Sequence, residues 1–243
     1  MSKRLRILAG PNGSGKSSVY KTLVQKKEFQ WGVFVNADEI EKKLRGEQYL
    51  NIQSYGVEDF DWGKFQADYQ SFVDLKGGKC GVDNLRYIDK KLFVLDAHLV
   101  DSYLASYVAT YIRNGLLLLN KKDFTFTIET VMSHESKLDF MRAARERGYR
   151  IYLYYISTSS PEINVGRVAT RVMSGGHNVP EDKIKSRYER SLRNLHEAIL
   201  LSDRAYIFDN SESSHQWIAE YDGATGELRY KEDEIPQWVG QYV

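Results

Sequence analysis

The octet G-P-N-G-S-G-K-S at residues 10–17 constrains the fold of this chain more than any other feature. It follows a short apolar run, residues 7–9, and precedes a helix-like stretch, residues 18–25. The pattern G-x-x-x-x-G-K-[ST] surrounds phosphate because its glycines let backbone N–H groups turn inward, and the next helix adds partial positive charge. With a strand before it and a helix after it, the octet predicts a P-loop NTPase fold.

The same octet predicts which residues bind a nucleotide. Lys16 should reach the β and γ phosphates of ATP or GTP, and the Ser17 hydroxyl should ligate Mg²⁺. The complete expected set is Gly10, Pro11, Asn12, Gly13, Ser14, Gly15, Lys16, Ser17 and Ser18.

The composition argues against several other classes of protein. The length of 243 residues suffices for one α/β domain, and the net charge of +1 gives no strong attraction to nucleic acid or membrane. The single cysteine, Cys80, excludes an intrachain disulfide and a cysteine-based zinc site. Residues 1–6 are basic but enter the octet too soon to form a signal peptide, and residues 116–119, the longest apolar run, cannot cross a bilayer. We therefore expect a cytoplasmic protein.

Strand-like runs alternate with helical patterns along the chain. Strands are expected at residues 5–9, 32–36, 124–129, 150–157 and 205–209. The alternation predicts an α/β fold with a doubly wound parallel sheet of about five strands and right-handed crossovers. A C-terminal hairpin should follow at residues 218–230.

We interpret residues 1–243 as a single domain. Residues 45–95, where aromatic residues, Gly and Asp are scattered between several breaks, are interpreted as a partly helical insertion. A long crossover helix is expected at residues 97–119, and further helices should begin at Ser133 and Pro161.

Asp38 follows an expected strand and so lies at the edge where parallel α/β sheets bind ligands. Its carboxylate could accept a proton from an attacking hydroxyl or hold a metal-bound water. The alternative is an acid in the first turn of a helix, which the helix dipole favours by itself. Position alone leaves both interpretations open.

Glu129 ends an apolar strand in I-E-T-V, where a Walker B acid would lie. Charged residues seldom end a buried strand without a partner, and Mg²⁺ or a substrate hydroxyl would supply one. No D-E-x-H or L-S-G-G-Q pattern follows in the sequence, which disfavours a transporter ATPase or a helicase.

Basic residues gather around the Gly175-Gly176 pair: Arg167, Arg171, His177, Arg187 and Arg190. Arg167 and Arg171 are four residues apart and share one helix face. We interpret residues 167–187 as a lid that closes over a transferring phosphoryl group and neutralises its charge. The alternative for a single arginine is a solvated charged face, and His177 could cap the turn instead of contacting phosphate.

Four segments together resemble the zeta-toxin family of P-loop kinases, in particular its branch of small bacterial predicted ATPases. They are G-P-N-G-S-G-K-S, N-A-D-E-I, F-T-I-E-T-V and R-V-A-T-R-V-M-S-G-G-H-N-V-P-E-D-K-I-K-S-R-Y-E-R-S-L-R-N-L. The resemblance covers residues 5–41 and 97–210, and the G-G-H-x-V-P-E stretch is its most specific part. Residues 45–95 have no counterpart in it.

The resemblance implies a kinase-like domain that uses Mg²⁺ and ATP or GTP, and an antitoxin protein as partner. The best-known members phosphorylate a hydroxyl of UDP-N-acetylglucosamine. Carried over, Asp38 is the general base, and the catalytic set is Asp38, Lys16, Arg167 and Arg171. Asp38, Glu129, Thr130 and His177 would contact the substrate, and Ser17 and Glu129 the metal.

Two departures from the family pattern concern the substrate. The toxins typically follow the acid of the third strand with a G-T-G-R-like stretch, where this chain has T-V-M-S. A second lid arginine of the toxins falls near His177, and Arg171 is the candidate substitute.

The sequence thus predicts an NTP-dependent kinase that transfers the γ-phosphoryl group to a small-molecule hydroxyl, possible acceptors including nucleotide sugars. One alternative is an NTP-binding switch without catalysis. Another is a polynucleotide kinase, against which the near-neutral charge counts.

Overall fold

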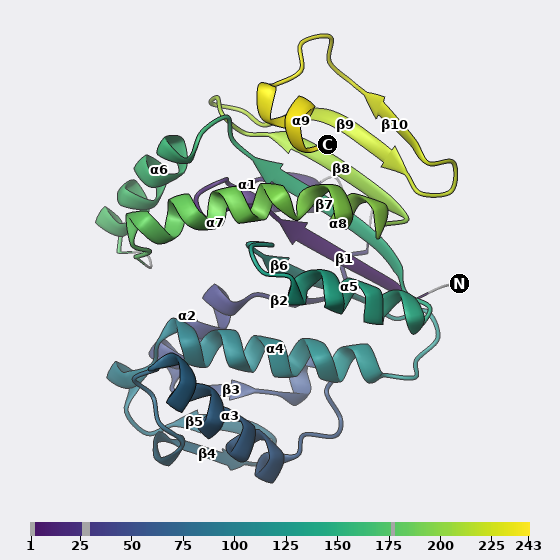
Figure 1. Cartoon of the computed structure of the whole chain (residues 1–243). Helices are drawn as coiled ribbons and strands as arrows, with labels where there is room; N and C mark the ends of the chain where they lie inside the picture. Colours follow the sequence, from purple (N-terminus) through teal and green to yellow (C-terminus); the bar gives the residue numbers. More distant parts are fainter. Residues whose placement is uncertain (1–2, 26–29, 176–177) are drawn as a thin grey trace. The chain divides into compact units, whose positions relative to one another are not determined.

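The computed structural model describes residues 3–25, 30–175 and 178–243. The chain forms two compact units (Figure 1). Unit 1 contains Met1–Gly32 and Lys121–Val243, and unit 2 contains Val33–Asn120. The phosphate-loop motif, Glu129 and the arginines of the basic segment all belong to unit 1, whereas Asp38 belongs to unit 2.

A mostly parallel sheet forms the centre of unit 1. Its strands follow the spatial order β10-β9-β8-β7-β1-β6. They are β1 (Arg4–Ala9), β6 (Thr125–Thr130), β7 (Arg150–Ser157), β8 (Arg204–Asp209), β9 (Gln216–Asp222) and β10 (Glu227–Tyr230). β1 pairs in parallel with β6 and β7, and β7 with β8, while β9 and β10 form the antiparallel edge. The predicted α/β fold with a parallel sheet and a C-terminal hairpin is confirmed.

The central strand β1 is buried because helices cover both faces of the sheet. Leu5, Ile7 and Leu8 are at most 1% exposed. Figure 1 shows α5, α7 and α8 in front of the sheet and α1 behind it. The helices of unit 1 are α1 (Lys16–Gln25), α5 (Ser136–Glu146), α6 (Pro161–Met173), α7 (Glu181–Arg193), α8 (Leu195–Leu200) and α9 (Gln237–Tyr242).

The helix expected to begin at Ser133 begins at Ser136 instead. The reason lies in the preceding loop, where Met132 has a positive φ of 59° and the Ser136 N–H donates to His134 Nδ1. These residues form a turn before the helix can start.

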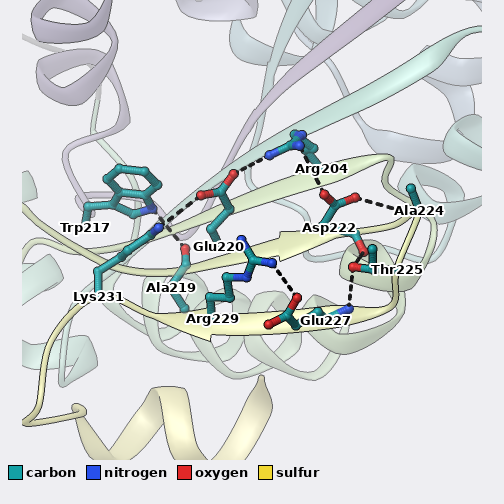
Figure 2. A network of polar contacts seen from close by, with 10 residues as sticks. All are labelled: Arg204, Trp217, Ala219, Glu220, Asp222, Ala224, Thr225, Glu227, Arg229 and Lys231. Carbon is teal, nitrogen blue, oxygen red and sulfur yellow. Dashed lines mark hydrogen bonds and ion pairs between the residues drawn. The ribbon is translucent and has the colours of Figure 1, made fainter.

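The hairpin β9–β10 presents a network of charges on one face, shown in Figure 2. The Arg204 guanidinium bridges Glu220 at 2.6 Å and Asp222 at 3.1 Å, and Lys231 lies 3.3 Å from Glu220. Such half-exposed pairs each contribute little to stability. On the edge strand β10 itself, Arg229 pairs with Glu227 at 2.6 Å, and charged side chains on an edge discourage another strand from pairing with it.

Unit 2 has a sheet and a core of its own. It contains β2 (Val33–Val35), α2 (Ala37–Glu47), β3 (Tyr49–Asn51), α3 (Trp62–Lys76), β4 (Leu85–Ile88), β5 (Lys91–Val94) and α4 (Ser102–Leu118), with 3-10 turns at Gln53–Tyr55, Val82–Asn84 and Ala97–Leu99. The strands β3, β5 and β4 form an antiparallel sheet. Phe65 and Tyr69 of α3 are fully buried, and the Tyr69 hydroxyl donates to Cys80 O at 2.7 Å.

The residues interpreted as an insertion, 45–95, lie within unit 2. The boundaries proposed for the domain, the insertion and the lid stay predictions.

The single helix expected at 97–119 is interrupted after the 3-10 turn. Asp101 accepts hydrogen bonds from the N–H groups of Tyr103 and Leu104, so α4 begins at Ser102.

Among the residues described, no helix is both long enough and apolar enough to span a bilayer.

Candidate nucleotide-binding site

The phosphate loop connects β1 to α1 and packs tightly on its neighbours. Gly13 has a φ of +78°, and a Cβ there would lie 2.5 Å from Asn164 O in α6. Only glycine fits both this backbone conformation and this close approach. The loop is therefore shaped by contact with α6 as well as by its own sequence.

Lys16 lies inside the loop and is only 7% exposed. Its Nζ donates to Gly10 O at 2.9 Å and to Pro11 O at 3.0 Å. The same atom lies 3.9 Å from Glu129 Oε1. The ammonium is thus held at the centre of the loop, next to a carboxylate, where an incoming phosphate would meet it.

The register of the sheet explains why Glu129 lies beside the loop. β1 and β6 end together, with Leu8 opposite Glu129 and Ala9 opposite Thr130. The Gly10 N–H donates to Thr130 O at 3.2 Å. Thr130 itself is buried, and its hydroxyl accepts from the N–H of Met132 at 3.2 Å. The two residues predicted at this strand end therefore differ: the Glu129 carboxylate lies beside Lys16, whereas the Thr130 hydroxyl accepts a hydrogen bond from its own loop and keeps its O–H as a donor.

The residues expected to hold Mg²⁺ offer the chemistry that this ion prefers. Glu129 supplies a carboxylate with 13% of its side chain exposed, and Ser17 an exposed hydroxyl in the first turn of α1. Mg²⁺ is usually held by one or two carboxylates together with phosphate oxygens and water. In the described part of the chain, no group of three or more His, Cys, Asp or Glu side chains could bind a metal by itself. The donor set fits a metal that arrives with a nucleotide.

Arg167 extends from α6 to the loop that follows β8. Its guanidinium donates to Asn210 O at 2.6 Å, to Glu212 O at 3.1 Å and to Ser211 O at 3.3 Å. In this arrangement the Arg167 guanidinium is bound by the backbone carbonyls of the loop after β8.

Another arginine contacts the tip of the phosphate loop. Arg187 of α7 is half-buried, and its Nη1 lies 3.5 Å from Asn12 Oδ1. Arg171, near the end of α6, is also half-buried. His177 lies outside the described residues.

α6 and α7 are joined to each other and α7 is anchored to the sheet. Val168, Val179 and Ile184 form the buried contact between the two helices. The Tyr188 hydroxyl donates to Thr158 O at 2.6 Å, and burial raises the pKa of Tyr188 to about 12, so this donor stays protonated at neutral pH. α7 is thus packed against α6 at its start and hydrogen-bonded to the segment after β7 further along.

Asp38 lies in unit 2, exposed in the first turn of α2. Asn36 Oδ1 accepts from the N–H of Asp38 at 2.7 Å and from that of Glu39 at 3.2 Å, which caps the helix. This cap fixes the backbone from which the Asp38 carboxylate projects.

Beside the phosphate loop in unit 1 there is a pocket of about 490 Å³. Its lining consists of Gly15, Ser18, Thr22, Arg167, Asn210, Ser213, Ser214 and His215. The volume is in the range of small-ligand sites. A nucleoside attached to phosphates in the loop would find this pocket next to α1.

The sequence-based interpretation did not single out Asn210 or Asn164, and it gave Arg187 no specific role. One signal could have found Asn210, because it directly follows the expected strand 205–209, at the same sheet edge as the phosphate loop. Arg187 carries no such signal, because its helix face becomes apparent only when α7 is packed against the sheet.

A family model described as AAA domain (AAA_33) matches residues 5–195, which include the phosphate loop, Glu129 and both helices of the basic segment. The chain belongs to this family. The match confirms the expectation of a P-loop domain. The narrower assignment to the zeta-toxin family is a proposal.

Among curated proteins, an uncharacterized protein of Haemophilus influenzae is 40% identical over 68 residues, which cover 28% of this chain and 49% of that protein. Among solved structures, a chain of the AvrRxo1-ORF1:AvrRxo1-ORF2 complex with sulphate ions is similar, with a TM-score of 0.61 and 15% identity over 99% of this chain and 63% of that one. In a second structure of that complex, with ATP, the TM-score is 0.59 and the identity 15%, over 95% of this chain and 61% of that one. The chain thus spans less than two thirds of these relatives, and the structural likeness concerns the fold.

Proposed function

We propose that this AAA domain protein is an NTP-dependent kinase that transfers the γ-phosphoryl group to a hydroxyl of a small molecule. The observation that carries the proposal is the buried Lys16 ammonium, held in a phosphate loop 3.9 Å from the Glu129 carboxylate. The neighbouring pocket with Arg167 and Asn210 offers room for a nucleoside. The similar AvrRxo1 complex was crystallised with ATP, which supports a nucleotide ligand.

In the proposed reaction the triphosphate lies along the loop from residue 10 to residue 18. Lys16 exchanges its bonds to Gly10 O and Pro11 O for phosphate oxygens and orients the β and γ groups. Ser17 and Glu129 would hold Mg²⁺, which neutralises phosphate charge when bound. The acceptor hydroxyl gives its proton to Asp38 and its oxygen attacks the γ-phosphorus, while the bond to the bridging oxygen breaks and the nucleoside diphosphate leaves.

The arginines of α6 and α7 would stabilise the charge that develops during transfer. Arg187 is a candidate because it contacts Asn12 at the loop tip. Arg167 and Arg171 complete the proposed cation set, with Arg167 contacting the loop that borders the pocket. Closure of the segment 167–187 over the phosphates would exclude water.

The acceptor is proposed from the zeta-toxin resemblance, which suggests a nucleotide sugar such as UDP-N-acetylglucosamine. Glu129, Thr130 and His177 would then contact the substrate. An antitoxin protein as partner rests on the same resemblance, and a cytoplasmic location on the reasoning from sequence.

A screen with purified protein tests the kinase proposal directly. Mg·ATP and Mg·GTP are offered with a panel of nucleotide sugars and sugars, and products are read by mass spectrometry. The expected result is one acceptor that gains a single phosphoryl group. Nucleotide binding with no phosphorylated product from any acceptor would instead favour the non-catalytic switch.

Replacing Lys16 with alanine should remove most nucleotide binding, because the ammonium directed at the phosphates is lost. The measurement is the thermal shift with Mg·ATP or Mg·GTP, since a ligand at 100 times its Kd stabilises the folded protein by about 2.7 kcal/mol. Lys21→Ala is the matched control, an exposed lysine on the same helix, and it should keep the wild-type shift. Equal shifts in Lys16→Ala and wild type would contradict the role of Lys16.

A further inference from the structure

Asn210 lines the proposed nucleoside pocket, and it also makes contacts that this role does not explain. It directly follows β8, and its N–H donates to Ser157 O at the end of β7 at 2.8 Å. Its side-chain Nδ2 donates to Ser14 O of the phosphate loop, also at 2.8 Å. Its own carbonyl accepts from Arg167 Nη1 at 2.6 Å. One residue thus connects the sheet edge, the phosphate loop and an arginine of α6.

The bond to Ser14 O fixes the orientation of a peptide group that phosphate binding needs. The C=O and N–H of a trans peptide point in opposite directions, so holding Ser14 O toward Asn210 turns the Gly15 N–H away from it. Gly15 has a φ of +88°, and a Cβ there would lie 2.1 Å from Asn210 Nδ2. The missing side chain of Gly15 is therefore what lets the amide approach the loop.

The segment that carries Asn210 is itself firmly held. Asp209 is 5% exposed, and its carboxylate accepts from Trp238 Nε1 of α9 at 2.6 Å and from the Ser211 N–H at 2.8 Å. The Ser211 hydroxyl in turn accepts from the Ser159 N–H at 2.8 Å. Because these hydrogen bonds hold its backbone in place, the Asn210 side-chain amide can fix the position of the phosphate loop.

We propose that Asn210 is a positioning residue for phosphate binding. It holds the Ser14–Gly15 peptide so that the Gly15 N–H points to the phosphate. Through the hydrogen bond between its own carbonyl and Arg167, it also connects this peptide to the position of the Arg167 guanidinium. The inference rests on the proposed nucleotide-binding function and adds to it a residue outside the P-loop motif.

The decisive variant is Asn210→Asp, which keeps the shape of the side chain but replaces the donor amide with a carboxylate that repels Ser14 O. The probe is inorganic tripolyphosphate with Mg²⁺, measured by calorimetry, because it reports on the phosphate loop without the nucleoside pocket. We expect the tripolyphosphate affinity to fall by about 10- to 100-fold, as for loss of a hydrogen bond that holds the phosphate loop. Asn210→Ser is neutral but too short to reach Ser14 O, so it should lose a similar amount of tripolyphosphate affinity. It replaces the aspartate variant in the test if that variant does not fold.

Asn194→Asp is the matched control. The Asn194 amide donates to Met132 O at 2.9 Å, a bond of the same kind within unit 1. It should lower the melting temperature while tripolyphosphate affinity stays within about twofold of wild type. The positioning role would be overturned if the folded Asn210 variants bound tripolyphosphate as tightly as wild type, or if Asn194→Asp lost as much affinity as they do. In both cases tripolyphosphate binding by the wild type would still support the phosphate loop. Absence of tripolyphosphate and ATP binding in the wild type would overturn both proposals.

Discussion

Replacing Arg187 with alanine should lower kcat by about 10³- to 10⁵-fold, the range for arginines that stabilise a transferring phosphoryl group. Arg187 contacts the tip of the phosphate loop, with Nη1 3.5 Å from Asn12 Oδ1. Such a cation acts on charge that develops in the transition state, so the affinity for the diphosphate product should change far less than kcat. Steady-state kinetics with the acceptor found in the screen, together with calorimetry of ADP or GDP, would measure both quantities.

Matched variants separate this role from general loss of charge. Arg190→Ala removes an exposed arginine one turn further along α7 and should leave kcat near wild type. Arg187→Lys should restore little activity, because a point charge does not reproduce the planar guanidinium. Arg167→Ala and Arg171→Ala should also be severely impaired if the three arginines act together. A kcat for Arg187→Ala within a few-fold of Arg190→Ala would make Arg187 a packing residue of α7.

The second large effect is expected for Asp38→Asn, with transfer reduced by about 10²- to 10⁴-fold because a positioned general base is lost. The amide keeps the size of the side chain and leaves the Asn36 cap of α2 in place. The nucleotide-induced thermal shift should therefore equal that of wild type.

Glu39→Gln is the control, an exposed acid in the same helical turn. If both variants turn over at the wild-type rate, Asp38 is a helix-start acid, which is the alternative that the sequence left open. If Asp38→Asn also loses the nucleotide shift, the residue contributes to binding and the base assignment is wrong.

Local sequence signals predicted much of unit 1. The octet marked the junction of β1 and α1, and the apolar run ending at Glu129 marked the strand that ends beside it. Both signals work because a parallel sheet brings the ends of its strands to one edge. The proximity of Lys16 and Glu129, at 3.9 Å, follows from that rule.

The remaining features depend on contacts that are distant in the sequence. Asn210 reaches Ser14 because β7 and β8 are in register up to Ser157 and Asp209, and the next residue then meets the phosphate loop. The α4 boundary depends on the Asp101 side chain, which competes with the helical pattern around it. Residues 45–95 gave weak periodicity, because their short strands and aromatic core are stabilised by packing within unit 2 rather than by an amphipathic pattern.

The strand order of unit 1 determines when the phosphate loop can be built during folding. β1 is synthesised well before its two neighbours in unit 1, β6 (Thr125–Thr130) and β7 (Arg150–Ser157). Pairing over such separations is slow, whereas β3, β4 and β5 pair within a short stretch of chain. Until β6 and β7 have been synthesised, β1, with its apolar Leu5, Ile7 and Leu8, has neither of its pairing partners. An apolar strand with unpaired edges favours aggregation, so the late pairing of β1 is a feature of this fold that affects how the chain reaches its native state.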